Sequence, residues 1–118
     1  TARDLQQKAK DKGLPWDIAK GFNGSAPISD TFIPVEKFPD VKNINFKLEV
    51  NGKLKQQGNT SLMLFPFDYM LSYLSKFFTL KTGDLIFTGT PKGVGPVTPG
   101  DTLSAYIENE KLLEFQVK

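Results

Sequence analysis

The stretch that most constrains the fold is residues 45–57, in which an Asn51-Gly52 pair interrupts a regular alternation of side chains. Residues 45–50 alternate between apolar and charged side chains, which is the two-residue period of a half-buried strand. Asn-Gly is typical of a two-residue type I′ turn, after which residues 53–57 can return as a partner strand. The pattern predicts a β-hairpin that serves as scaffold.

A second hairpin is predicted near the C-terminus. Apolar residues alternate with polar ones along 103–107 and again along 113–117, on either side of Glu108-Asn109-Glu110. The short apolar run Leu85-Ile86-Phe87 predicts a further, buried strand. Three expected strand regions of this kind indicate a chain that is mostly β.

Two helices are expected. The first covers residues 2–10, with Thr1 as its N-cap and Gly13 as the left-handed residue beyond its C-terminus. The second begins at Pro66, where apolar side chains recur at helical spacing and predict a core-facing stripe. Core positions are also expected at three large side chains that follow the first helix: Trp16, Ile18 and Phe22.

Composition excludes several classes of protein. The 118 residues suffice for one domain with a modest core, and a net charge of +2 with scattered basic residues gives no reason to expect a nucleic-acid partner. No apolar run approaches the length of a membrane span, so no membrane partner is expected. The absence of Cys and His rules out disulfides, thiolate metal sites and a histidine base from this chain, and a cytoplasmic location is expected.

A loop rich in Gly and Pro follows the expected strand, over residues 88–96. Gly removes the Cβ and permits positive φ, while Pro stiffens the chain, so a ligand can approach such a backbone closely. A tight connection between strands fits the same composition equally well. The loop does not have the order of a phosphate-binding P-loop, in which Gly-Lys is followed by Ser or Thr.

Three polar residues near the N-terminus are candidates for binding an anion. Arg3 and Gln6 are spaced i,i+3 and share one face of the expected helix, where their in-plane donors could hold a carboxylate or simply be solvated. Lys20 lies between Ala19 and Gly21, where it is either an ordinary surface lysine or a group that stabilises negative charge on a substrate.

The order of these motifs resembles the C-terminal half of the fumarylacetoacetate hydrolase family, and most closely its acylpyruvate hydrolase and oxaloacetate decarboxylase branch. The resemblance runs the whole length of the chain. It rests on Thr1-Ala2-Arg3-Asp4-Leu5-Gln6, Gly13-Leu14-Pro15-Trp16, Ala19-Lys20-Gly21-Phe22, Val50-Asn51-Gly52, Gln57-Gly58-Asn59-Thr60, Thr79-Leu80-Lys81-Thr82-Gly83-Asp84, Thr88-Gly89-Thr90-Pro91 and Gly93-Val94-Gly95-Pro96.

The resemblance implies an α+β fold, mostly β: a mixed β roll with flanking helices, usually in a homodimer. Residues 1–118 would be a single domain and the C-terminal portion of a longer catalytic domain. The family's cofactor is Mg²⁺ or Mn²⁺, sometimes Ca²⁺, held by a Glu-x-Glu pair and an Asp that would precede Thr1. No metal ligand is therefore expected in this chain, and Glu108-Asn109-Glu110, in an expected turn, is not taken as that pair.

The same resemblance assigns roles to four residues. Lys20, Gln6 and Arg3 match catalytic positions, and all three together with Thr90 match positions that bind the substrate. Lys20 would stabilise charge on an enolate oxygen, Gln6 and Arg3 would donate hydrogen bonds to substrate oxygens, and Thr90 would donate to the substrate carboxylate.

The expected function is that of a metal-dependent hydrolase that cleaves a C–C bond in small β-diketo acids, such as acylpyruvates or fumarylpyruvate. An oxaloacetate decarboxylase or a hydroxy-dienedioate isomerase of the same family is an alternative. A further alternative is a catalytically inactive fragment that acts only in dimerisation, and residues 1–118 alone are not expected to turn over substrate.

Overall fold

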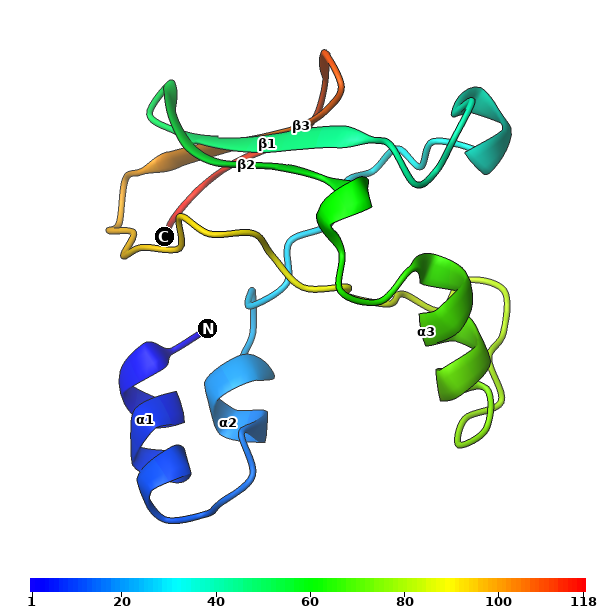
Figure 1. The fold of residues 1–118 in the computed structure, drawn as a ribbon. Helices are drawn as coiled ribbons and strands as arrows, with labels where there is room; N and C mark the ends of the chain where they lie inside the picture. Colours follow the sequence, from blue (N-terminus) through cyan, green and yellow to red (C-terminus); the bar gives the residue numbers. More distant parts are fainter.

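The computed structural model describes the whole chain, Thr1–Lys118, with a β-sheet on one side and three short helices on the other (Figure 1). Two of its four strands come from residues 45–59 and the other two from residues 102–116. This α+β, mostly β architecture is the one that the sequence predicted. The elements in order are α1 (Arg3–Asp11), α2 (Asp17–Lys20), η1 (Val35–Lys37), β1 (Asn45–Val50), β2 (Lys53–Asn59), η2 (Thr60–Leu62), α3 (Phe67–Leu74), β3 (Thr102–Ile107) and β4 (Glu110–Gln116).

The sheet has the strand order β2-β1-β3-β4, and all neighbouring strands are antiparallel. Its two hairpins are those expected from the alternation. Asn51 and Gly52 have φ of 52° and 71°, the two positive angles of a type I′ turn. At the other hairpin Glu108 takes a φ of 51°, and its carboxylate accepts a hydrogen bond of 2.7 Å from the Asn45 backbone N–H. That bond ties the second turn to the start of β1.

The sheet has one apolar and one polar face. Residues that are directly opposite in neighbouring strands share a face, and the register pairs Leu48 with Ala105 and Glu49 with Ser104. On the polar face Lys47 Nζ lies 2.6 Å from a Glu49 oxygen and 4.3 Å from the centre of the Tyr106 ring. The hydrogen bond between Lys47 and Glu49 lowers the pKa of Glu49 and raises that of Lys47. This face needs no covering layer.

The helices α1 and α2 form an antiparallel pair that is joined at one end by the Ala2 N–H, which donates to the Ala19 carbonyl at 2.9 Å. Helix α1 begins at Arg3, with Ala2 in the N-cap position, so the expectation that Thr1 caps the helix is wrong. The Thr1 hydroxyl instead accepts from Lys20. Gly13 has a φ of 64° and ends the helix as predicted.

Segment 79–101 contains no strand, so the prediction of a buried strand at Leu85–Phe87 is wrong. No backbone–backbone hydrogen bond involves residues 85–97. Leu85 and Phe87 are 48% and 67% exposed. An apolar run becomes a strand only where a second strand can pair with it, and these residues have no such neighbour within the chain.

Large apolar side chains cover much of the surface. Only Ala19, Ile44 and Ser104 are buried, and the accessible surface is 9541 Å². A compact monomer of this mass would expose about 6,400 Å². The predicted core positions Trp16, Ile18 and Phe22 are therefore wrong for this chain by itself. The core-facing stripe predicted after Pro66 is wrong at Leu71, and also at Phe77 and Phe78, which lie beyond the end of α3.

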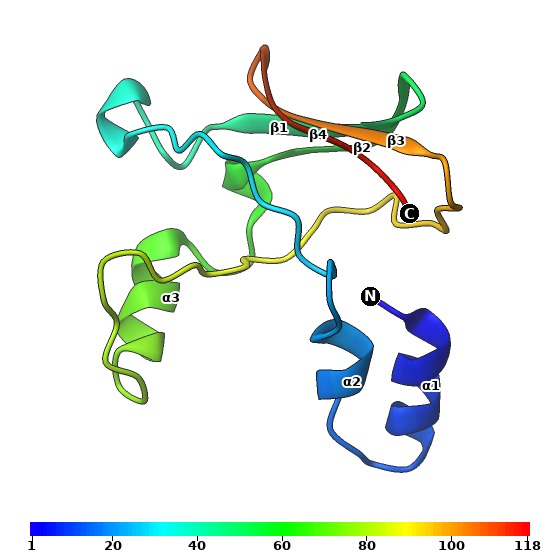
Figure 2. The ribbon, with the colours of Figure 1, turned by 180° about the vertical axis from the view of Figure 1, so that it is seen from behind.

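The spread of the chain agrees with that surface. Its radius of gyration is 15.8 Å, whereas a compact domain of this length has about 13.5 Å. Figure 2, seen from behind, shows the three α-helices below the sheet, with residues 85–97 running between the helices and the sheet. No helix combines the length and the apolar character that crossing a bilayer requires.

Candidate active site

The helical pair carries three of the four predicted site residues. Arg3 and Gln6 lie in the first two turns of α1, and Lys20 is the last residue of α2. Lys20 Nζ lies 3.4 Å from the Thr1 hydroxyl, to which it donates, and 5.9 Å from the centre of the Trp16 ring. This end of the pair is the one that points toward the sheet and residues 85–97 (Figures 1 and 2).

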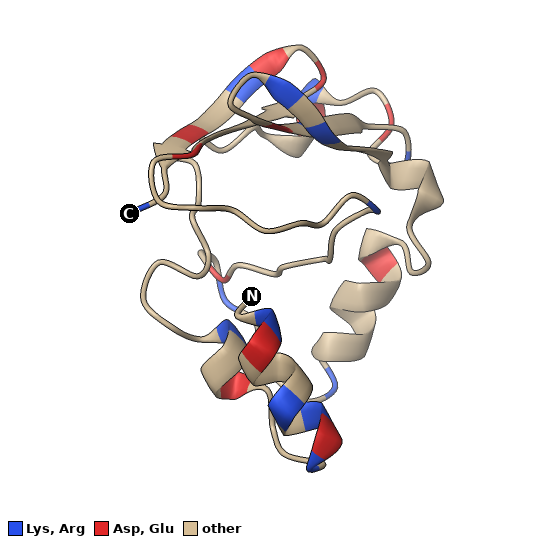
Figure 3. Cartoon of the chain, turned by 90° about the vertical axis from the view of Figure 1, so that its left-hand side faces the viewer, with Lys and Arg blue, Asp and Glu red and all other residues tan.

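Neither Arg3 nor Lys20 forms a salt bridge with a carboxylate. Only two salt bridges are present, Lys47–Glu49 and Lys111–Glu114, and both lie on the sheet. Charged side chains are spread along the helices and strands, while residues 85–97 carry a single one, Lys92 (Figure 3). The end of the helical pair therefore offers two free cations next to a segment without acidic groups.

Thr90 is held by the sheet rather than by the helices. The Gln56 side chain, on β2, donates from Nε2 to the Thr90 hydroxyl at 2.8 Å and to the Pro91 carbonyl at 2.9 Å. Two residues later Gly93 has a φ of 102°, and a Cβ there would collide with the Lys55 carbonyl oxygen. The loop is thus seated directly on the backbone of β2.

The structure brings Arg3, Gln6 and Lys20 to one end of the helical pair and places Thr90 on a different support. No hydrogen bond joins Thr90 to any of the other three. Convergence of all four on one substrate stays a prediction. Gln56 was missed at the sequence level, because a regular two-residue hairpin would pair Leu48 with Lys55. Only the register shift between Leu48 and Glu49 places Gln56 opposite Leu48.

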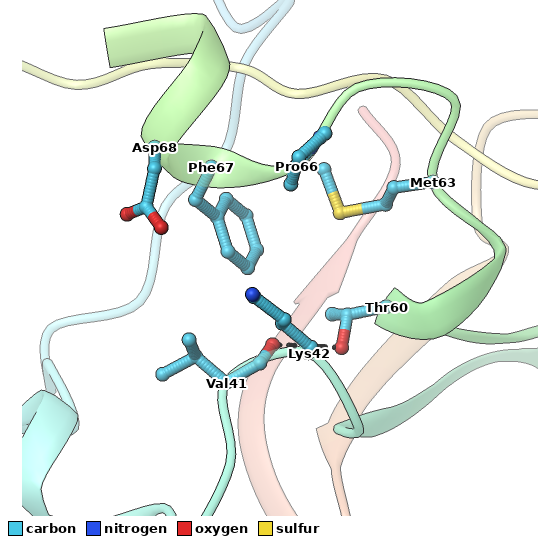
Figure 4. Close-up of a pocket in the computed structure, with 7 residues that line it drawn as sticks. All are labelled: Val41, Lys42, Thr60, Met63, Pro66, Phe67 and Asp68. Atoms are coloured by element: carbon cyan, nitrogen blue, oxygen red, sulfur yellow. Dashed lines mark hydrogen bonds between the residues drawn. The ribbon is translucent and has the colours of Figure 1, made fainter. Parts of the chain in front are cut away.

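A small hollow lies elsewhere, between η2, the start of α3 and the residues before β1 (Figure 4). Within it the Thr60 hydroxyl donates to the Val41 carbonyl at 2.8 Å and accepts from the Ile44 N–H at 2.9 Å. None of the four predicted site residues lines it. Its lining is Val41, Lys42, Thr60, Met63, Pro66, Phe67 and Asp68. We interpret it as a structural junction because the Thr60 hydroxyl bonds two backbone groups of the segment that precedes β1.

The side chains of this chain do not build a metal site by themselves. The structure contains no group of three or more Asp, Glu, His or Cys side chains that could hold a metal ion. In the Glu-x-Glu sequence at 108–110, both carboxylate oxygens of Glu108 accept hydrogen bonds from Asn45 at the start of β1. The residues present therefore do not fit a divalent cation without further ligands.

Comparison with known families decides what this arrangement belongs to. The model of the fumarylacetoacetate (FAA) hydrolase C-terminal family matches residues 1–118. The chain belongs to the fumarylacetoacetate hydrolase family. Among curated members of the family, oxaloacetate tautomerase FAHD1 of Bos taurus is 51% identical over 118 residues, which cover 100% of this chain and 53% of the relative. A mitochondrial oxaloacetate decarboxylase of Dictyostelium discoideum is 47% identical over 107 residues, covering 91% of this chain and 49% of the relative.

Solved structures of the fumarylacetoacetate hydrolase family agree with the fold. A yeast member superimposes with a TM-score of 0.85 at 40% identity, over 100% of this chain and 52% of that one. Fumarylpyruvate hydrolase of Pseudomonas aeruginosa, in complex with Mn²⁺ and pyruvate, gives a TM-score of 0.87 at 36% identity, over 97% of this chain and 48% of that one. The chain thus spans about half the length of the relatives that it matches.

Proposed function

We propose that this chain is the C-terminal portion of an enzyme that interconverts or cleaves small keto acids, with oxaloacetate as the first candidate substrate. The choice of oxaloacetate is supported by relatives that bear that name and match all or nearly all of the chain at 47–51% identity. Tautomerisation and decarboxylation of such a β-keto acid both develop negative charge on the oxygen next to the reacting carbon. A site for either reaction therefore needs donors and positive charge at that oxygen.

The observation that carries the proposal is the free cationic end of the helical pair. Lys20 and Arg3 form no salt bridge, and Lys20 interacts only with the neutral Thr1 hydroxyl and with the Trp16 ring, whose centre is 5.9 Å from its Nζ. Both cations are thus available to an anionic ligand. In the proposed mechanism Lys20 stabilises the enolate oxygen, while Arg3 and Gln6 donate hydrogen bonds to the other substrate oxygens.

The proposal includes a larger catalytic unit around these residues. The exposed apolar side chains, the unpaired backbone of residues 85–97 and the excess of surface are what a part of a larger core would present. We propose that further chain covers these surfaces and supplies the carboxylates for a divalent cation, Mg²⁺ or Mn²⁺. The Mn²⁺ bound to the Pseudomonas relative supports such an ion. A homodimer and a cytoplasmic location stay predictions.

A second candidate is the hydrolysis of acylpyruvates or fumarylpyruvate. It is supported by the fumarylpyruvate hydrolase structure, whose bound pyruvate is itself a small keto acid. The donors required at the keto-acid end of these substrates are the same as for oxaloacetate. What differs is the group on the far side of the cleaved bond.

The test uses the full-length protein with Mg²⁺ or Mn²⁺ and a panel of substrates. Oxaloacetate tautomerisation is followed by the loss of enol absorbance, decarboxylation by the release of pyruvate, and hydrolysis by the loss of the diketone absorbance of acetylpyruvate or fumarylpyruvate. We expect the highest kcat/KM with oxaloacetate. A higher value with a diketo acid would favour the second candidate, and no turnover of any keto acid would refute both.

A further inference from the structure

Gln56 is a polar side chain on the apolar face of the sheet. In the β1–β2 register it lies directly opposite Leu48, whose other cross-strand partner is Ala105. Its neighbour Gln57 lies opposite Lys47 on the polar face and makes no side-chain hydrogen bond. A partly buried amide at an apolar position costs free energy unless it is hydrogen-bonded. Gln56 meets that requirement only through the loop at Thr90 and Pro91.

The chemistry of Pro91 fixes which way the amide of Gln56 points. The backbone of Pro91 has a carbonyl and no N–H, so the Gln56 atom 2.9 Å from that carbonyl must be the donating NH₂ group. The same nitrogen lies 2.8 Å from the Thr90 hydroxyl oxygen. Gln56 therefore donates to Thr90, and the hydroxyl oxygen is the acceptor.

This direction decides what the Thr90 hydroxyl can offer to a ligand. A hydroxyl has one proton to donate, and because Gln56 fills a lone pair of its oxygen, that proton is left for another partner. A carboxylate accepts hydrogen bonds and donates none, so it requires a donor in this orientation. The seating of Gly93 on the Lys55 carbonyl holds the loop at the distance at which the Gln56 amide reaches it.

We propose that Gln56 is a positioning residue that orients the Thr90 hydroxyl as a donor toward the substrate carboxylate. The inference rests on the proposed function, and on the role of donor to the substrate carboxylate that the family resemblance gives to Thr90. Gln56 does not itself touch the substrate. Its removal should therefore weaken substrate binding and leave the chemical step nearly intact.

The decisive variant is Gln56→Glu in the full-length enzyme. A Glu carboxylate is close to isosteric with the amide but accepts a hydrogen bond, so the Thr90 proton would turn inward and the donor for the substrate would be lost. We expect KM for oxaloacetate to rise about tenfold, which is the effect of one hydrogen bond of about 1.4 kcal/mol, while kcat changes less than threefold. The matched control is Gln57→Glu, which places the same charge on the opposite face and should leave KM unchanged.

A double-mutant cycle with Thr90→Val separates positioning from a general disturbance. If Gln56 acts through the Thr90 hydroxyl, Gln56→Glu should have little further effect on KM once that hydroxyl is gone. Equal effects of Gln56→Glu in both backgrounds, or a wild-type KM in Gln56→Glu, would overturn the inference. The proposed function would survive either result, because it depends on turnover of a keto acid by the unaltered enzyme.

Hydrogen exchange tests the tether without any assay of activity. The test uses the full-length enzyme, in which we propose that further chain covers residues 85–97. Gln56→Met keeps the length of the side chain and removes both hydrogen bonds to the loop. We expect faster amide exchange in a peptide that covers residues 88–95, with the β3–β4 hairpin unchanged. Unaltered exchange in that peptide would show that Gln56 does not hold the loop, and would overturn the inference even for an enzyme whose substrate proved to be different.

Discussion

The four-stranded sheet and segment 85–97 both contain apolar residues that predict strands, but only the sheet forms them. Strand β1 pairs with a strand on each side, whereas segment 85–97 pairs with none. The strands of the sheet are hydrogen-bonded to one another within the chain, whereas residues 85–97 make no backbone–backbone hydrogen bond and only the Pro91 carbonyl accepts one from a side chain. The sheet is thus the part of the molecule that stabilises itself.

This difference predicts a division between residues that determine stability and residues that determine catalysis. Substitutions in the sheet should change the free energy of unfolding and leave catalysis alone. Substitutions in the loop at Thr90 and at the free end of the helical pair should change catalysis with little effect on unfolding, because few native contacts depend on them. Each prediction below tests one side of that division.

The largest effect is expected for Lys20→Met in the full-length enzyme. Loss of a group that stabilises developing charge costs about 100-fold or more in kcat. The melting temperature should be unchanged, since Lys20 makes only one long hydrogen bond, to Thr1. The control is Lys10→Met in the last turn of α1, whose exposed side chain makes no bond and whose loss should not affect kcat. Turnover of Lys20→Met at the wild-type rate would remove Lys20 from the mechanism.

The second-largest effect is expected for Gly93→Ala, and Gly95→Ala is its matched control. A Cβ at Gly93 would strike the Lys55 carbonyl, and the φ of 102° is unfavourable for any other residue, so the loop must leave β2. At Gly95 a Cβ would meet nothing within 4 Å. We expect kcat/KM to fall at least tenfold in Gly93→Ala, through displacement of Thr90, and to change little in Gly95→Ala. Equal losses in the two variants would mean that the contact with β2 is not what matters.

The two hairpins could be predicted from the sequence because their determinants are local. Asn51-Gly52 specifies its own turn, and alternation places Phe46 and Leu48 on one face whatever lies beyond the sheet. The structure of Leu85–Phe87 could not be predicted in the same way. An apolar run indicates that residues tend to be buried or paired in a sheet, but it does not identify the segment that buries or pairs with them. The exposure of Trp16 and Ile18 has the same origin.

The candidate site divides along the same line. That Arg3 and Gln6 share a helix face follows from their i,i+3 spacing. The approach of Lys20 to the start of α1 depends on the Ala2–Ala19 hydrogen bond, which no spacing rule contains. The clamp of Gln56 on Thr90 joins residues 34 positions apart and required the strand register. Local motifs identified the groups, and only the fold identified what supports them.

A smaller effect, on the sheet side of the comparison, is expected for Gly52→Ala. Gly52 has a φ of 71° at the type I′ turn, and a residue with a Cβ pays about 1–2 kcal/mol in this region. No neighbouring atom lies within 4 Å of the added Cβ, so the effect should be one of backbone strain alone. Urea unfolding should show this loss of stability, with kcat of the folded enzyme within twofold of the wild type. A large loss of activity at full stability would contradict the division.

The smallest effect is expected from the carboxylate that joins the loop to the sheet. Asp101 accepts hydrogen bonds from the Thr98 N–H at 2.8 Å and from the Asn51 side chain at 2.8 Å. Both bonds hold the pKa of Asp101 below its usual range, and the bond from the Thr98 N–H has the larger effect. A lowered pKa means that the folded state favours the charged carboxylate. The stabilisation that Asp101 gives to the fold is therefore present above the pKa that this carboxyl has in the unfolded chain, and it is lost as the pH falls through the lower pKa of the folded state.

Stability should therefore decline as the pH drops below about 4, and Asp101→Asn should reduce the slope of that decline by removing the group that titrates. Unfolding midpoints measured between pH 6 and pH 2 give the slope, with Asp30→Asn as the control because the carboxylate of Asp30 is exposed and accepts no hydrogen bond. If both variants kept the wild-type slope, the acid sensitivity would come from other carboxylates. Glu114 is the first to examine, since the Lys111 hydrogen bond lowers its pKa in the same sense.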